Sequence, residues 1–340
     1  MVLELAFDPS SKFLAAGTAD SHIKVFDAVK GFQTHNFTGG HRGIITNLTF
    51  FPEKDTLLLI SSAEDCQVKV WDLVMRAEIA HLKGHSALIT SIGFTSDMST
   101  LITCAKDGKL GFWNVKENFA SLSLFKYSKV EEELNVVHFF EHQDSPYLII
   151  GGASGSLSIF DINQAKQCFK QRDTEYTSNE VTKIFSSKVT GKVWVLNSDQ
   201  QLTEYEVTGK KTPKLRQTAL NCHYLDEIID VRLLRESDDS DTQPTKAVIC
   251  SNNELLKVVD LGTGKVEQSP KEHSHSDIIL CVDAAGHDLF VTGSKDNSIR
   301  LWRYTPEGKL VCLAVFTGHN ENVASVCFAP KRNNFFVSAS

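Results

Sequence analysis

The chain has 340 residues, of which 41% are hydrophobic, and its formal net charge is −7. This length allows one large domain or two, and the composition is that of an ordinary globular protein. The negative charge argues against a protein that coats nucleic acid through its overall charge, and the chain has neither an apolar run of about 18 residues nor a secretory signal pattern.

The first pattern along the chain lies in residues 3–27. Leu5 and Phe7 mark a first strand, residues 15–17 a second, and residues 23–27 a third. Later copies of this pattern open with a Gly-His pair, which here would precede residue 1. We therefore expect the chain to begin inside a structural unit and to be a fragment.

The next two segments carry the pattern in full. A Gly-His pair precedes three strands, a Ser or Thr lies four residues before an Asp, and a Trp lies six residues after that Asp. The marked residues are His41, Ser61, Asp65 and Trp71 in one copy, and His85, Thr103, Asp107 and Trp113 in the other.

Three weaker copies follow. In the fourth, residues 136–161, Phe160 takes the place of the Trp and Ser154 that of the Asp. The fifth has strand patterns from 181 to 205 around Asp199, and the sixth has them from 228 to 260, interrupted by a solvated acidic insertion at 236–244. We count these copies because the turn positions recur every 42 to 54 residues throughout.

The last two copies return to the strong pattern. The seventh contains His275, Thr292, Asp296 and Trp302, and the eighth has His319 and reaches Ser338. In strand–turn–strand geometry, the four side chains of a full copy can converge, because the Trp and His rings donate, the Asp accepts and the hydroxyl does both. Such a network is tolerable when buried only if it is fully satisfied, and we expect it to fix the turn.

The repeated Gly-His, Asp and Trp positions, with about 40–45 residues per copy, resemble the WD-repeat family. The resemblance implies an all-β fold of four-stranded antiparallel blades in WD40 β-propellers.

Other chemistries fit the sequence less well. Ser, His and Asp occur together as in a hydrolase triad, but they recur identically in three copies, which favours a structural role. Residues 262–265 lack the Ser or Thr and the helix of a phosphate loop, and His273 and His275 have no third metal ligand nearby. The eight scattered cysteines are typical of small buried hydrophobes in a reducing compartment. We expect no enzyme activity, no cofactor and no metal.

Two sets of residues are candidates for partner contacts. Seven basic residues lie between 183 and 216, where they could bind RNA phosphate or an acidic partner, although a solvated face is the simpler interpretation. They are Lys183, Lys188, Lys192, Lys210, Lys211, Lys214 and Arg216. The second set lies in the loops before the first strands and in the turns before each Asp, where partners generally dock on propellers: Arg42, Glu64, Lys106, Asp277, Lys295 and Glu321.

The order of strong and weak copies is similar to that of one family, the transducin-β-like nucleolar WD-repeat proteins. These are tandem-propeller subunits of the UTP-B part of the small-subunit processome. The similar phrases include LAFDPSSKFLAAG at 5–17, a His-rich link at 31–37, the weak copy at 227–258, and residues 276–280 with 294–303. Ordinary WD repeats have Asp after the last Trp, where this chain has Arg303.

This second resemblance implies a non-enzymatic nucleolar scaffold that is required for pre-rRNA processing and small ribosomal subunit biogenesis. Its partners would be other WD-repeat subunits of UTP-B, together with pre-rRNA and small nucleolar ribonucleoprotein, directly or indirectly. Residues 1–216 would belong to a first propeller that lacks its initial blades, and residues 217–340 would begin a second.

Two other binding roles stay open at this point. A substrate receptor of a cullin-type ubiquitin ligase often has Trp-Asp-x-Arg after a third strand, whereas Val74 follows Trp71, Asp72 and Leu73 here. A G-protein-β-like signalling scaffold would have coiled-coil heptads at its N-terminus, and the chain shows none in this stretch.

Overall fold

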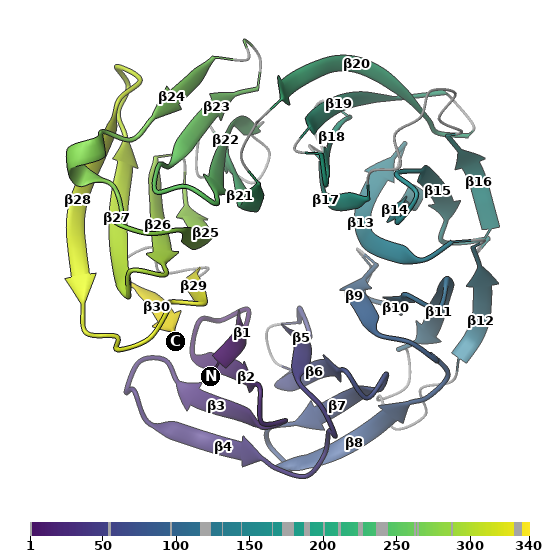
Figure 1. Cartoon of the computed structure of the whole chain (residues 1–340). Coiled ribbons are helices and arrows are strands. Elements are labelled where there is room, and N and C mark those ends of the chain that lie inside the picture. The colour runs from purple at the N-terminus through teal and green to yellow at the C-terminus, as the bar shows by residue number, and fades with distance from the viewer. Residues whose placement is uncertain are drawn as a thin grey trace. The chain divides into compact units, whose positions relative to one another are not determined.

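The computed structural model describes residues 2–53, 56–95, 97–115, 124–130, 132–143, 145–164, 166–171, 180–186, 191–199, 201–209, 212–223, 227–235, 244–261, 263, 265–286, 288–329 and 335–340. These residues form two compact units (Figure 1). The first unit comprises Met1–Ala19, Ile23–Asn36 and Tyr224–Ser340, and the second comprises Asp20–His22 and Phe37–His223.

Each unit is built from sheets of four strands that follow one another in the chain and pair antiparallel. We call each sheet a blade and number the blades in chain order. The second unit contains blades 2 to 5. Blade 2 comprises β5 (Ile45–Phe50), β6 (Leu58–Ala63), β7 (Val68–Asp72) and β8 (Ala77–Leu82), and blade 3 comprises β9 (Ile89–Phe94), β10 (Thr100–Ala105), β11 (Lys109–Asn114) and β12 (Leu124–Lys129). Blade 4 comprises β13 (Leu134–His142), β14 (Ser145–Gly152), β15 (Leu157–Asp161) and β16 (Lys166–Lys170), and blade 5 comprises β17 (Val181–Ser186), β18 (Lys192–Asn197), β19 (Gln201–Thr208) and β20 (Lys214–His223).

The first unit contains three blades and a two-stranded sheet, which we call half-blade 8. They are blade 1, with β1 (Val2–Phe7), β2 (Phe13–Thr18), β3 (Ile23–Asp27) and β4 (Gln33–Phe37); blade 6, with β21 (Ile228–Arg235), β22 (Pro244–Ser251), β23 (Lys257–Asp260) and β24 (Val266–Gln268); blade 7, with β25 (Ile279–Ala285), β26 (Leu289–Ser294), β27 (Ser298–Tyr304) and β28 (Leu310–Thr317); and half-blade 8, with β29 (Ser325–Phe328) and β30 (Phe336–Ala339). Between blades 6 and 7 the described residues include one 3-10 turn, η2 (Lys271–His273).

The predicted all-β class and four-stranded antiparallel blades are confirmed, including blades 4 to 6, where the sequence pattern is weak. The second strand of each blade explains why. It is buried on both faces, as β6 shows with every residue buried. A strand that is covered on both sides loses the polar alternation of a half-exposed strand and reads as a continuous apolar run.

The hydrophobic cores lie between successive blades. In the second unit, Val70 of β7 and Leu101 of β10 belong to one cluster, and Leu110 of β11 and Leu148 of β14 belong to the next. In the first unit, Val258 of β23 shares a cluster with Trp302 of β27. Each blade is therefore stabilised by its neighbours rather than by a core of its own, as in other repeat proteins.

Every complete blade has a one-residue bulge near the start of its first strand. The bulged residues are Leu3, Thr46, Thr90, Asn135, Thr182, Ile229 and Leu280. In the second unit, three Thr hydroxyls at this position, those of Thr46, Thr90 and Thr182, donate to a carbonyl of the second strand at 3.0 to 3.3 Å. A bulge bends its strand and increases the local twist, so this feature repeats with the blade although no single residue type marks it.

Candidate functional site

Blade 2 brings its four marked side chains into one buried chain of hydrogen bonds. The Trp71 indole N–H donates to Ser61 Oγ at 2.8 Å, and Ser61 Oγ lies 2.8 Å from His41 Nε2. His41 Nδ1 lies 3.0 Å from Asp65 Oδ2. Because the carboxylate only accepts, His41 donates from Nδ1, its Nε2 accepts from Ser61, and the Ser61 oxygen remains free to accept from Trp71.

A steric constraint explains why the residue before this histidine, Gly40, is a glycine. A Cβ on Gly40 would lie 2.2 Å from Cη2 of Trp71. The indole therefore packs directly on the backbone of Gly40, and the Gly-His pair and the Trp are parts of one arrangement.

Blade 3 repeats the arrangement. Trp113 donates to Thr103 Oγ1 at 2.9 Å, and His85 Nε2 lies 2.7 Å from the same oxygen. His85 Nδ1 lies 3.3 Å from Asp107, which also accepts from the backbone N–H of Ser86 at 2.8 Å. The carboxylate thus joins the loop before the first strand to the turn between the second and third strands.

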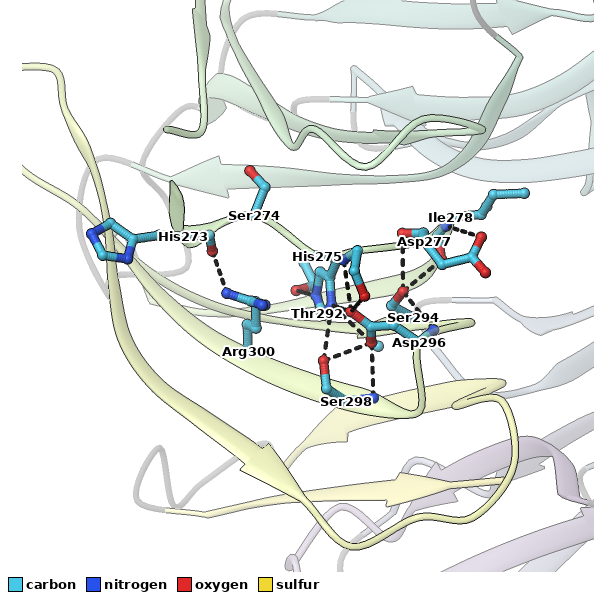
Figure 2. A network of polar contacts seen from close by, with 12 residues as sticks. His273, Ser274, His275, Asp277, Ile278, Thr292, Ser294, Asp296, Ser298 and Arg300 are labelled. Atoms are coloured by element: carbon cyan, nitrogen blue, oxygen red, sulfur yellow. Dashed lines mark hydrogen bonds and ion pairs between the residues drawn. The ribbon is translucent and has the colours of Figure 1, made fainter. Parts of the chain in front are cut away.

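Blade 7, in the first unit, repeats the arrangement with one added hydroxyl, that of Ser298 (Figure 2). His275 lies between Asp296 at 3.0 Å and Thr292 at 2.8 Å, and Trp302 donates to Thr292 at 2.9 Å. Ser298 adds a hydroxyl that donates to Asp296 at 2.6 Å. The four predicted side chains of this blade are therefore joined by hydrogen bonds in one chain.

The electrostatics keep the histidines neutral and the carboxylates charged. Burial lowers the pKa of His41, His85 and His275, although the neighbouring carboxylates act in the opposite direction. Burial by itself raises the pKa of Asp296, but hydrogen bonds from Ser298 and Ser276 outweigh it and lower that pKa to about 2. A neutral imidazole that is held on both sides by fixed partners is a structural element here.

In blade 4 the carboxylate lies in the loop before the first strand and the donors lie in the turn, the reverse of blades 2, 3 and 7. Glu132 stands in the loop where other blades have the His, and its carboxylate accepts from the hydroxyls of Ser154 and Ser156 in the turn. Lys170 Nζ lies 3.7 Å from the same carboxylate. The predicted placement of Ser154 is correct as a position in the turn, but its partner Glu132 has no counterpart in the sequence pattern.

In blade 5 the buried polar pair is Trp194 and Glu204, which lie one residue before the Ser/Thr and Trp positions of the sequence pattern. Trp194 lies on the second strand and donates its indole N–H to Glu204 on the third strand at 3.2 Å. Glu204 is buried and also receives Lys192 Nζ at 2.9 Å and the Thr218 hydroxyl at 2.9 Å. Burial raises the pKa of Glu204, but the bonds from Lys192 and Thr218 lower it overall. In the sequence, this network is marked only by a Trp and a Glu that lie ten residues apart.

Blade 6 and half-blade 8 hold only parts of the arrangement. Asn253, in the Asp position, accepts from the backbone N–H of Leu255 at 3.0 Å. In half-blade 8, His319 Nε2 lies 2.8 Å from Ser338 Oγ.

The predicted loop residues lie at the blade end that carries the His and Asp side chains. In the second unit, Arg42, Glu64 and Lys106 are exposed, and the backbone N–H of Arg42 donates to Asp65 at 2.9 Å. In the first unit, Lys295 and Glu321 are exposed and Asp277 is half-buried beside Ser294 (Figure 2). Each unit therefore presents charged side chains of both signs at this end.

The predicted basic segment is not gathered into one patch in the described residues. Lys183 lies on β17, Lys192 on β18, and Lys214 and Arg216 on β20, across the full width of blade 5. Lys192 pairs with Glu204, and Arg216 Nη2 lies 3.3 Å from Glu206. Lys188, Lys210 and Lys211 lie outside the described residues.

The remaining reactive side chains are inert or dispersed. Among the described residues, no group of three His, Cys, Asp or Glu side chains could hold a metal ion, and no helix is long and apolar enough to cross a membrane. Cys104, Cys250 and Cys281 are buried, while Cys66, Cys312 and Cys327 are half-buried. Burial raises the thiol pKa of Cys104, Cys281 and Cys327 to about 12, so these thiols are protonated at neutral pH.

The spacing and the networks agree with a match to the sequence profile described as "WD domain, G-beta repeat", which covers residues 2–27, 31–72, 76–114, 264–303 and 310–340. The chain belongs to the WD40 repeat family. The unmatched segments contain the strands of blades 4 and 5 and most of blade 6, which are WD-type blades by structure and have lost the sequence motif.

Among curated proteins, this WD40 chain is similar to transducin beta-like protein 3 of Bos taurus and of Homo sapiens, each at 29% identity and over the whole chain. The chain spans about 41% of the length of these relatives. A guanine nucleotide-binding protein subunit beta of Oryza sativa subsp. indica is 24% identical over 54% of this chain and 51% of that protein.

Among solved structures, the chain resembles the computationally designed Ika8 protein, with a TM-score of 0.73 and 22% identity over 99% of this chain and 92% of that one. This likeness concerns the fold alone. Proteins of the WD40 family typically act as scaffolds for protein–protein contacts, which is the coarse functional class of this chain.

Proposed function

We propose that this chain is part of a non-enzymatic WD-repeat scaffold of the small-subunit processome, required for pre-rRNA processing and small ribosomal subunit biogenesis in the nucleolus. The observation that carries the proposal is the alignment of the whole chain with transducin beta-like protein 3 from four mammals at 28 to 29% identity. Other WD40 proteins, such as the rice G-protein β subunit, align with only about half of it.

The polar networks support a scaffold role. The Ser, His and Asp side chains that could serve as a hydrolase triad satisfy one another and a Trp indole, so that His41 and His275 have no ring nitrogen left for a substrate. These groups fix turns, and what the blades then offer to other molecules is their exposed loop ends. Arg42, Glu64 and Lys106 in the second unit and Lys295 in the first are the proposed contact residues.

The domain organisation is part of the same proposal. Residues 1–216 would belong to a first WD40 propeller and residues 217–340 to the start of a second, within a longer protein whose partners are other WD-repeat subunits of UTP-B. Pre-rRNA and small nucleolar ribonucleoprotein would be contacted directly or through those subunits.

Affinity purification of the tagged protein from its source cells, with and without RNase, tests the proposal. We expect WD-repeat ribosome-assembly subunits that survive RNase, together with pre-rRNA that does not. Recovery of a cullin and its adaptor, or of G-protein subunits, without ribosome-assembly factors would contradict it. A double variant, Arg42→Glu with Lys106→Glu, should reduce recovery of the partners, whereas the exposed control Met75→Lys should not.

A further inference from the structure

A pocket of about 160 Å³ opens between blades 3 and 4 of the second unit. Phe94 ends β9, and Pro146 and Tyr147 begin β14, so the pocket lies at the blade end opposite to the His and Asp side chains. Its apolar wall is made of four aromatic rings and two aliphatic side chains: Phe94, Phe139, Phe140, Tyr147, Pro146 and Ile162.

Contacts within and between the two blades hold this wall in place. A Cβ on Gly93 of β9 would lie 1.9 Å from Cε2 of Phe139, so the Phe139 ring lies directly against the β9 backbone. The rings of Phe140 and Tyr147, on neighbouring strands, stack at a centroid distance of 5.7 Å. An apolar cavity of about 150 Å³ is large enough to bind benzene, so this pocket has room for one phenyl group.

The Tyr147 side chain adds a polar group to the apolar wall. Tyr147 is 7% exposed, and its hydroxyl makes no hydrogen bond to any residue that the structure describes. Burial, and secondly the nearby Asp161 carboxylate, raise the pKa of Tyr147, so the hydroxyl keeps its proton at neutral pH. Because most buried polar groups in proteins are paired, this donor is available to an acceptor on a ligand.

The surroundings of the pocket are acidic. Glu141 is exposed and carries the only charge among the described residues that line the pocket. Thr95, the other polar lining residue, donates its hydroxyl to Asp97 at 2.6 Å. One carboxylate therefore stands beside the pocket on each blade, which favours a ligand with a positive charge next to its apolar group.

We propose that this pocket binds a phenylalanine side chain in an extended segment of a partner protein, with a basic residue next to that phenylalanine. The phenyl group lies among the aromatic rings, the Tyr147 hydroxyl donates to a backbone carbonyl of the segment, and Glu141 pairs with the basic residue. A buried aromatic anchor of this kind carries much of the affinity in many protein–protein interfaces. The pocket is separate from the loop residues of the proposed function, and its ligand does not depend on that assembly.

Blocked tripeptides serve as probes for the 340-residue protein, with binding followed by NMR titration. Acetyl-Lys-Phe-Lys-amide should bind saturably, and acetyl-Lys-Ala-Lys-amide should bind at least about tenfold more weakly, because the burial of the phenyl group is lost. Acetyl-Glu-Phe-Glu-amide should also bind more weakly than the Lys-flanked peptide. Equal affinity for the Phe and Ala peptides, or no saturable binding of the Phe peptide, would overturn the proposal.

Protein variants locate the binding. Tyr147→Phe removes a hydroxyl that has no partner within the described blades, so it should leave the free energy of unfolding unchanged while weakening the Lys-flanked Phe peptide about threefold to tenfold. Glu141→Lys should weaken the same peptide and strengthen the Glu-flanked one. Glu133→Lys, at the other end of β13, is the matched control and should change neither. Peptide binding that neither Tyr147→Phe nor Glu141→Lys alters would place the site elsewhere and contradict the assignment.

Discussion

The Ser154 hydroxyl donates to the Glu132 carboxylate at the place where blades 2, 3 and 7 join a histidine to an aspartate. The carboxylate has moved from the turn to the loop before the first strand, and the same two segments remain connected. The connection between loop and turn is therefore retained in blade 4 although all four motif residues have changed.

Replacing Glu132 with Ala should destabilise the second unit by about 0.5–1.5 kcal/mol, because it removes the hydrogen bonds that the exposed Ser154 and the half-buried Ser156 donate to the carboxylate. Urea unfolding of the protein measures this change. The exposed neighbour gives the control: Glu133→Ala should change the unfolding free energy by less than about 0.5 kcal/mol. Equal effects of the two substitutions would show that the Glu132 network contributes nothing specific.

Ser61 should be among the most sensitive positions of blade 2. It is fully buried and joins His41 to Trp71, so Ser61→Ala leaves an imidazole nitrogen and an indole N–H unpaired. We expect a loss of about 2–4 kcal/mol, since a buried group without its partner loses more than the net value of one bond. Ser61→Thr keeps the hydroxyl, as blades 3 and 7 do naturally, and should recover most of the loss. If Thr destabilised as much as Ala, packing rather than hydrogen bonding would be the cause.

Gly40 and Trp71 should show strong coupling in a double-mutant cycle. Gly40→Ala alone places a methyl group 2.2 Å from the indole, which the surrounding blade cannot relieve without moving the ring. We expect a loss of about 1–3 kcal/mol. In the Trp71→Phe background the same substitution should be milder, because the smaller ring leaves room. Additive effects, measured by thermal or urea unfolding, would contradict this explanation of the Gly-His pair.

The buried histidines should make stability fall in mild acid. Burial lowers the pKa of His138 to about 4, and its Nε2 lies 2.7 Å from Ser186 Oγ. The unfolded chain binds this proton near pH 6.5 and the folded chain does not, so the stabilisation is complete above pH 6.5 and is lost as the pH falls towards 4. For His138 alone the loss is on the order of 3 kcal/mol. His138→Gln should flatten the dependence of the unfolding free energy on pH between 6.5 and 4, and an unchanged slope would contradict the assignment.

The sequence was most informative where residue spacing and chemistry agreed. The spacing of Asp65, Asp107 and Asp296 from their Ser, Thr and Trp partners sets the register of the two strands that flank each turn. The recurring interval between turns located blades 4 to 6, which lack the motif. Apolar second strands explain that success, because every blade must fill the space between its neighbours whatever its turns contain.

The parts that the sequence did not predict depend on register and on distance across a sheet. Trp194 meets Glu204 from the second strand, one residue out of step with the motif, so the six-residue rule does not find it. The basic residues at 183–216 are close in the sequence, but successive strands separate those that the structure describes across blade 5, and Lys192 and Arg216 meet carboxylates. The strand bulges leave no trace because Leu, Ile, Thr and Asn all occupy the same position.

Depletion of this protein in its source cells, followed by hybridisation to small-subunit pre-rRNA and sedimentation of ribosomal subunits, tests the proposed scaffold role most directly. The account predicts that unprocessed pre-rRNA accumulates and that free small subunits decrease relative to large subunits. Re-expression of the full protein should restore both, and the Arg42→Glu, Lys106→Glu variant should do so only in part. Normal pre-rRNA processing and normal subunit ratios in depleted cells would contradict the proposed role, whatever the protein binds.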